Sequence, residues 1–205
     1  MDIKPIETVY NGYRFRSRLE ARWAVFFDAA NIRYQYEPEG FVGYLGIPYL
    51  SDFYFTDFQV YAEVKGSDKQ LKEDIEKIDQ AIDFNSTPIS NGLVLLGDIP
   101  YTDNPALLPV FTLLYWDKGT AIADCVFDKW YGKGTFCRGD DEYGCMYDLF
   151  SGEYLNPDGS NISLQQRFID TANIPVVTET YWIMECYKKA RQARFEHGET
   201  PIIRR

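Results

Sequence analysis

Asp52, Glu63 and Lys65 have the side chains and the spacing to hold a cation and act beside it. They lie in residues 50–65, where two alternating segments flank Thr56-Asp57-Phe58-Gln59, a pattern that predicts an antiparallel hairpin. With the turn centred in that tetrapeptide, the register places Asp52 opposite Glu63. A four-residue loop centred there keeps this register, whereas an odd loop would put the two acids on opposite faces.

Two carboxylates in this arrangement need a positive charge between them. Directly opposed residues have Cβ atoms about 4.5–5.5 Å apart, so Asp52 and Glu63 would repel each other unless a cation separated them. Oxygen ligands suit Mg²⁺ or Mn²⁺, which can lower the pKa of a bound water and clamp a phosphodiester. Period-two alternation puts Lys65 on the same face as Glu63. There its ammonium could orient the metal-bound water or stabilise the species that forms from it. The turn itself lacks the glycine that tight hairpins favour.

Asp52, ten further residues and then Glu63-Val64-Lys65 resemble the signature of the PD-(D/E)XK nuclease superfamily, with Ser51 where the first proline would stand. The resemblance covers roughly Tyr10 to Gly97. It implies an α/β fold class with a restriction-endonuclease-like core of order α-β-β-β-α-β, in which helices flank a mixed central sheet. In many members an acidic residue on the first helix completes the metal site, and the resemblance implies Glu20 for that role. The stretches 16–28 and 190–201 also resemble small phage or prophage proteins with this core.

The elements expected in the first hundred residues follow the same order. Ser17-Arg18-Leu19-Glu20 is a capping-box pattern that predicts a helix from Ser17 to Ala30. A Tyr-rich alternating segment predicts a strand from Ile32 to Glu37, and a Gly- and Pro-containing loop follows through Pro48. After the hairpin, periodic Leu and Ile predict a helix from Leu71 to Phe84, and an apolar run predicts a buried strand from Gly92 to Gly97.

The second half is expected to be an extension of this core. We predict a core at residues 1–100 and an extension at 101–205 that packs on it, because 205 residues suit one substantial domain with an appendage. The extension should contain a hairpin formed by Phe111–Trp116 and Thr120–Phe127, and a closing helix from Thr178 to Glu196.

Arginines at the start of the first predicted helix are candidates for binding phosphate. Arg14, Arg16 and Arg18 crowd one short stretch, and a helix N-terminus attracts phosphate. The alternative is that they only solvate the helix start. A formal charge of −10 argues against non-specific nucleic-acid binding over the whole surface, but local basic patches can coexist with an acidic remainder.

Each catalytic candidate also has a purely structural interpretation. Asp52, Glu63 and Lys65 could form an ordinary cross-strand salt bridge on a solvated face, although the apolar neighbours of both acids argue against full exposure. The capping box already explains Glu20. Cys137 and Cys145 lack the paired Cys-x-x-Cys knuckle of a tetrahedral zinc site, so zinc is not expected there.

Composition indicates a folded protein, and the targeting and cysteine patterns lead us to expect it in the cytoplasm. Apolar residues make up 45% and aromatic residues 17%, which suits a well-buried core. We expect no membrane partner, because no long uncharged apolar run and no signal-peptide pattern occur, and the four scattered cysteines suit reduced thiols. The only histidine, His197, lies in a charged tail, which disfavours histidine-based chemistry.

From these observations we expect a metal-dependent nuclease that hydrolyses phosphodiester bonds, with DNA as the substrate. Asp52, Glu63 and Glu20 would bind Mg²⁺ or Mn²⁺, Lys65 would position or activate water, and the three arginines would bind the phosphates. The alternative is a catalytically inactive binding or inhibitor module with a protein partner, such as a phage counter-defence or regulatory protein.

Overall fold

A computed structural model describes the chain over most of its first two thirds and at one C-terminal helix. The described residues are 6–42, 46, 48–66, 91–101, 109, 111–116, 120–130, 133–140, 145–148, 153–154 and 177–195. The predicted helix at Leu71 to Phe84 lies outside them, as does His197. No helix in these ranges has the length and apolar character needed to cross a membrane.

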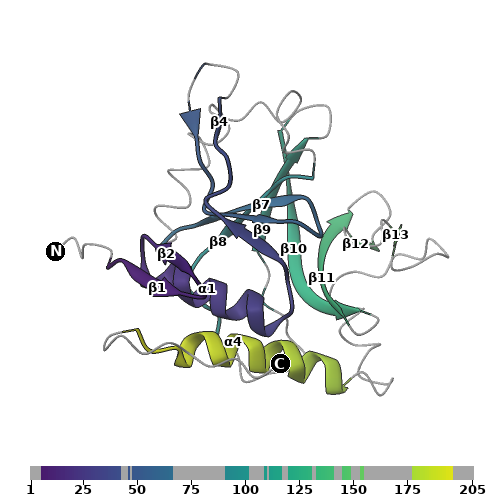
Figure 1. Ribbon diagram of the computed structural model, residues 1–205. Helices are drawn as coiled ribbons and strands as arrows, with labels where there is room; N and C mark the ends of the chain where they lie inside the picture. The colour runs from purple at the N-terminus through teal and green to yellow at the C-terminus, as the bar shows by residue number, and fades with distance from the viewer. Residues whose placement is uncertain are drawn as a thin grey trace.

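The described part has a mixed α/β architecture built on one large sheet (Figure 1). Its strand order is β13-β12-β11-β10-β9-β8-β7-β6-β3, and only β7 and β8 run parallel. These strands are β3 (Tyr34–Tyr36), β6 (Phe53–Phe55), β7 (Val60–Val64), β8 (Leu93–Leu96), β9 (Phe111–Trp116), β10 (Thr120–Trp130), β11 (Lys133–Asp140), β12 (Cys145–Asp148) and β13 (Glu153–Tyr154).

Two helices cover one face of this sheet. Helix α1 (Arg18–Ala29) and helix α4 (Val177–Gln192) lie side by side beneath the strands (Figure 1). Two short antiparallel ribbons complete the described elements: β1 (Thr8–Tyr10) with β2 (Tyr13–Phe15), and β4 (Phe41–Val42) with β5 (Pro48–Tyr49). The β4–β5 ribbon projects on the side away from the helices (Figure 1).

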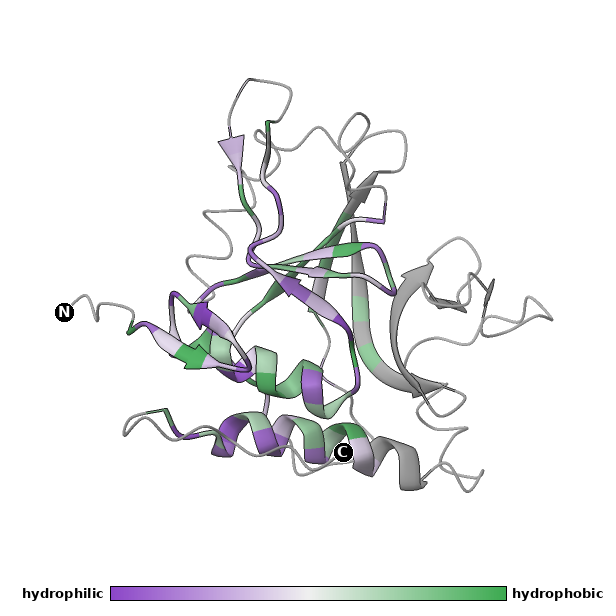
Figure 2. Cartoon of the chain, in the orientation of Figure 1, coloured by the Kyte–Doolittle hydropathy of each residue, from purple (hydrophilic) through white to green (hydrophobic). Residues whose placement is uncertain are grey.

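Aromatic side chains form the core between the helices and the sheet. Trp23, Phe26 and Phe27 recur at helical spacing on α1 and are fully buried. Phe26 stacks on Tyr187 of α4 at 4.2 Å between ring centroids, and meets Phe127 of β10 at 5.3 Å. Figure 2 shows hydrophobic residues gathered on α1 and the central strands, while α4 alternates between hydrophobic and hydrophilic positions. One core therefore joins both halves of the chain.

Most predicted elements are confirmed with small changes in their ends. Helix α1 has Ser17 as its N-cap, β3 lies inside Ile32–Glu37, and β8 lies inside Gly92–Gly97. The predicted hairpin of the second half is confirmed by the pairing of β9 with β10, although β10 continues to Trp130. Helix α4 ends at Gln192, so the predicted end at Glu196 was wrong.

The hydrogen bonding changes at the end of α4. Ala193 donates its backbone N–H to Ala190 at 3.3 Å, a three-residue spacing that tightens the last turn. The following residues, Arg194 and Phe195, leave the helix, and Phe195 packs against Tyr10 of β1 at 6.1 Å between ring centroids.

Both small ribbons were missed by the sequence analysis. The β1–β2 turn is Asn11-Gly12, with φ values of 47° and 84°, and Asn-Gly is a strong signal for a two-residue hairpin turn. The β4–β5 ribbon replaces the predicted loop, and its short strands carry no comparable pattern.

Candidate functional site

The β6–β7 hairpin has the predicted register. Phe53 pairs with Ala62 and Phe55 with Val60, across a four-residue loop at positions 56–59. Gln59 takes the left-handed conformation, with φ of 55°, in place of the missing glycine, and donates its N–H to Phe55 at 2.8 Å. Continued by one pair, this register places Asp52 opposite Glu63. The hairpin's other face is buried against the helices, as expected.

Asp52 is buried, and its two oxygens have different donors. Oδ2 accepts the backbone N–H of Val64 at 2.7 Å, and Oδ1 accepts Nη2 of Arg16 at 2.7 Å. Only 4% of Asp52 is exposed. Burial and the charge of Glu63 raise the pKa of Asp52 to about 7, against the opposing effect of the Val64 N–H. Burial and Glu63 therefore favour the protonated form of Asp52.

Glu63 is buried beside Lys65, on the same face of β7. The Nζ atom of Lys65 lies 2.8 Å from Glu63 Oε1, and the Tyr49 hydroxyl donates to Oε2 at 2.8 Å. Lys65 also donates its backbone N–H to Leu96, which ties the end of β7 to β8. The structure thus brings Asp52, Glu63 and Lys65 together, and adds Tyr49 from β5.

Glu20 lies at the N-terminus of α1, where it bonds to its own helix cap. Its Oε1 accepts the Ser17 hydroxyl at 2.7 Å, and its Oε2 accepts the Tyr36 hydroxyl at 2.6 Å and the Arg16 backbone N–H at 3.1 Å. Burial and this hydrogen bond to Glu20 raise the pKa of Tyr36, which keeps its hydroxyl protonated. Glu20 is close enough to Asp52 for its charge to raise the Asp52 pKa.

The described residues do not form a three-acid metal cluster. No group of three or more His, Cys, Asp or Glu side chains placed to hold one ion occurs among them. Asp52 and Glu63 are the carboxylates that the structure juxtaposes, whereas the described hydrogen bonds of Glu20 all go to the helix cap and to Tyr36.

The three candidate arginines lie in different surroundings. Arg14 is exposed and pairs with Glu7 at 3.2 Å. Arg16 reaches the acids: its Nη2 contacts Asp52, and its Nε lies 2.6 Å from Oε1 of Glu37. Arg18 begins α1 and is partly buried. Of the three, Arg16 has a described ion pair with a candidate metal ligand.

Sequence reasoning missed the partners that tertiary contacts supply. Tyr36 could be suspected from its place in an alternating strand, but its bond to Glu20 requires α1 to pack beside β3. Tyr49 carried no signal, because the β4–β5 ribbon must first return the chain to the hairpin. Glu37 carried none either, because its pair with Arg16 requires the segment before α1 to lie beside the end of β3. Arg16 was expected to bind phosphate, and no pattern indicated its bond to Asp52.

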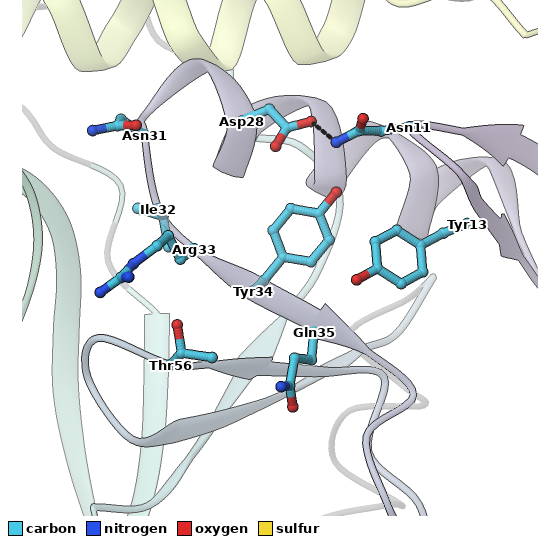
Figure 3. Close-up of a pocket in the computed structure, with 9 residues that line it drawn as sticks. All are labelled: Asn11, Tyr13, Asp28, Asn31, Ile32, Arg33, Tyr34, Gln35 and Thr56. Atoms are coloured by element: carbon cyan, nitrogen blue, oxygen red, sulfur yellow. Dashed lines mark hydrogen bonds between the residues drawn. The ribbon is translucent and has the colours of Figure 1, made fainter.

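A separate cavity of about 410 Å³ lies at the other end of β3. The β1–β2 ribbon, the end of α1 and the start of β3 form it, and Asn11 donates to Asp28 at 3.0 Å on its rim (Figure 3). Tyr13 and Tyr34 point into this space, with ring centroids 5.9 Å apart (Figure 3). None of Glu20, Asp52, Glu63 and Lys65 lines it.

Of the four cysteines, Cys125 and Cys186 are buried thiols outside any disulfide, and Cys125 Sγ donates to the Phe111 carbonyl at 3.4 Å. Cys137 and Cys145 lie on β11 and β12.

Comparisons of the chain with protein-family models, with curated proteins and with solved structures give no significant match. The side-chain geometry around Asp52 and Glu63 is therefore the basis for assigning a function.

Proposed function

We propose that this chain is a metal-dependent nuclease that hydrolyses phosphodiester bonds in nucleic acid, with DNA as the expected substrate. One observation carries the proposal: two buried carboxylates, Asp52 and Glu63, face each other across adjacent strands, with the Lys65 amine 2.8 Å from one of them. Burying two like charges together costs free energy, so such a pair suggests a site built for a cation.

The order of elements supports the same assignment. Helix α1 precedes β3, β6 and β7, which pair antiparallel in sequence order, and β8 adds parallel to β7. The resemblance to the PD-(D/E)XK superfamily implies this order of elements. The helix predicted between β7 and β8 lies outside the residues that the structure describes. We infer a restriction-endonuclease-like core on this basis.

The donors fit Mg²⁺ or Mn²⁺. Asp52 and Glu63 offer carboxylate oxygens, which are the ligands these hard cations prefer, and one oxygen of each is already oriented by Val64 or Tyr49. When bound, the cation supplies Lewis-acid chemistry, because it neutralises phosphate charge and makes water more acidic. Glu20 is close enough to Asp52 for its charge to act there, and it would contribute through that charge or by leaving its cap.

The remaining side chains have roles that follow from their positions. Lys65 can donate from Nζ to a phosphate oxygen or to the attacking water while it remains beside Glu63. Tyr49 orients Glu63 through its hydroxyl. Arg14 on β2, Arg16 just before the Ser17 cap and Arg18 in the first turn of α1 have guanidinium groups that can bind a nucleic-acid backbone.

The test is cleavage of DNA by the purified chain in the presence and absence of Mg²⁺. We expect Mg²⁺-dependent cleavage that falls by about 10²–10³-fold in Glu63→Gln and in Lys65→Ala, because each change removes a charge aimed at the reacting groups. Glu185→Gln and Lys188→Ala are matched controls, since these residues form an exposed pair on α4 at 3.0 Å. Wild-type protein without cleavage, or variants as active as wild type, would overturn the proposal.

A second candidate function is a binding or inhibitor module that keeps this architecture without turnover. One observation favours it: Arg16 and Lys65 already pair with Asp52 and Glu63, so the chain's own cations balance part of the charge of the acids. In that case wild-type protein would bind a nucleic acid or protein partner without cleaving it, and Glu63→Gln would leave the binding unchanged.

A further inference from the structure

Arg16 makes a contact that a phosphate-binding arginine does not need. Its Nη2 lies 2.7 Å from Oδ1 of Asp52, the oxygen that does not bond to the Val64 N–H. A guanidinium at this distance occupies one of the two lone pairs of Oδ1. A dication bound to Asp52 would repel the guanidinium beside it, so the two cations compete for this carboxylate.

The backbone of Arg16 is anchored beside the acids, whereas its side chain is more than half exposed. Its N–H donates to the Tyr36 hydroxyl at 3.0 Å and to Glu20 at 3.1 Å, which fixes the main chain beside the acids. The side chain is 56% exposed, against 5% for that of Asp52. Movement of the guanidinium into solvent would break its bonds to Asp52 and Tyr36 but disturb little packing.

Glu37 gives the displaced arginine a second partner. Its Oε1 lies 2.6 Å from Nε of Arg16, and its side chain is 32% exposed. The ion pair with Glu37 uses Nε and leaves the terminal nitrogens available. If the bond to Asp52 breaks, Arg16 can stay at the edge of the site with two donors for a phosphate group.

We propose that Arg16 couples cation binding to substrate binding: it holds Asp52 in the metal-free protein, and a divalent cation at Asp52 and Glu63 releases it to the nucleic-acid backbone. This inference rests on the proposed function. It adds an order of events, since the chain gains one phosphate contact only after the cation is bound.

The first experiment measures Ca²⁺ binding to the full chain by calorimetry at pH 8.5, without nucleic acid. Arg16→Gln keeps a hydrogen-bond donor but removes the charge that competes for Asp52. We expect it to bind Ca²⁺ roughly three- to tenfold more tightly than wild type, the effect of removing a partly exposed ion pair. Arg16→Lys, which keeps the charge, should stay near wild type. Thermal unfolding of each variant verifies that the fold is retained.

The second experiment measures binding to a DNA duplex by fluorescence anisotropy as a function of salt, in Ca²⁺ and in EDTA. In Ca²⁺, the slope of log affinity against log salt should fall by about one for Arg16→Gln, as for the loss of one phosphate contact. In EDTA, wild type and Arg16→Gln should have the same slope. Arg33→Gln is the matched control, because Arg33 pairs with Asp57 at the opposite end of the hairpin. It should leave Ca²⁺ affinity unchanged and affect both slopes equally.

The possible outcomes distinguish a failure of the Arg16 coupling from a failure of the nuclease proposal. If wild type binds Ca²⁺ and cleaves DNA, but Arg16→Gln binds Ca²⁺ no more tightly, the coupling is wrong and the nuclease proposal stands. An equal loss of slope with and without Ca²⁺ also overturns the coupling. If wild type binds neither Ca²⁺ nor Mg²⁺, both proposals fail.

Discussion

At the scale of single residues, the site consists of two buried acids, each paired with one basic side chain. Asp52 and Glu63 are buried, and burial penalises the ionised form of a carboxyl group. The compensating charges come from the half-exposed Arg16, which pairs with Asp52, and from Lys65, which pairs with Glu63. The compensation at Asp52 is incomplete, because its pKa remains raised. A buried acid near its titration point suits a cation site, since a dication stabilises the ionised form.

This raised pKa predicts how stability depends on pH in the metal-free protein. Folding raises the Asp52 pKa from 3.8 to about 7, so its contribution to stability is fully present below pH 4 and is lost as pH rises through 7. Urea unfolding in EDTA should therefore show wild type losing on the order of 2–4 kcal/mol more than Asp52→Asn between pH 4 and 8.

Glu39→Gln serves as the control for that measurement, because Glu39 is an exposed acid. It should follow the wild-type pH profile. Parallel profiles for wild type and Asp52→Asn would contradict the assignment of Asp52 as the titrating group.

At the scale of elements, the β6–β7 hairpin decides whether the two acids share a face. Its loop has four residues, an even number, which keeps Asp52 and Glu63 on one face. Gln59 adopts a left-handed backbone conformation at the end of this loop. The positive φ of a residue other than glycine stores strain of about 1 kcal/mol. The register that positions the site is therefore held at some local cost.

Replacing Gln59 with glycine should stabilise the protein. Gly adopts φ near 55° without a Cβ penalty, and Gln59 is exposed, so the change removes strain without removing a buried contact. We expect the free energy of unfolding to rise by about 0.5–1 kcal/mol in urea titrations.

Gln35→Gly is the matched control for this change. Gln35 is an exposed residue of β3 that pairs with Tyr54, and glycine within a strand should lower stability. If both glycine variants destabilise the protein equally, the strain at Gln59 does not exist.

At the scale of the whole molecule, one aromatic core joins elements from both halves of the chain. Phe26 of α1 contacts Tyr187 of α4 and Phe127 of β10, and β9 continues the sheet from β8. Because α1 packs in this core, the residues just before it, including Arg16, are held beside Asp52.

Truncating the centre of this core should weaken the described fold as one unit. We expect Phe26→Ala to cost about 3–5 kcal/mol, the usual effect of removing a buried aromatic ring. For a chain of this size that corresponds to a fall in Tm of roughly 6–20 °C. Calorimetric unfolding measures it.

Tyr181→Ala is the control, because Tyr181 is 52% exposed on the outer side of α4. It should change Tm little. Two separate transitions in Phe26→Ala, with only one shifted, would show that the halves fold independently.

Local patterns in the sequence predicted α1 with its Ser17 cap, strands β3 and β8, the β9–β10 hairpin and the register that opposes Asp52 to Glu63. These features depend on neighbours a few residues apart, where periodicity and turn length leave few alternatives. The Asn11-Gly12 dipeptide is an equally local signal, and it predicts the β1–β2 turn that the sequence analysis did not include. The surroundings of Glu20 followed in part from its capping box.

Tertiary structure alone decided what surrounds the acids. Arg16 reaches Asp52 across 36 positions of sequence and Tyr49 reaches Glu63 across 14, and both contacts exist because separate elements pack at one end of the hairpin. Burial, which raises the Asp52 pKa, is likewise a property of the assembled sheet and helices. Spacing along the chain determined which residues face each other within an element, whereas the charges that neutralise them depend on contacts that no local pattern encodes.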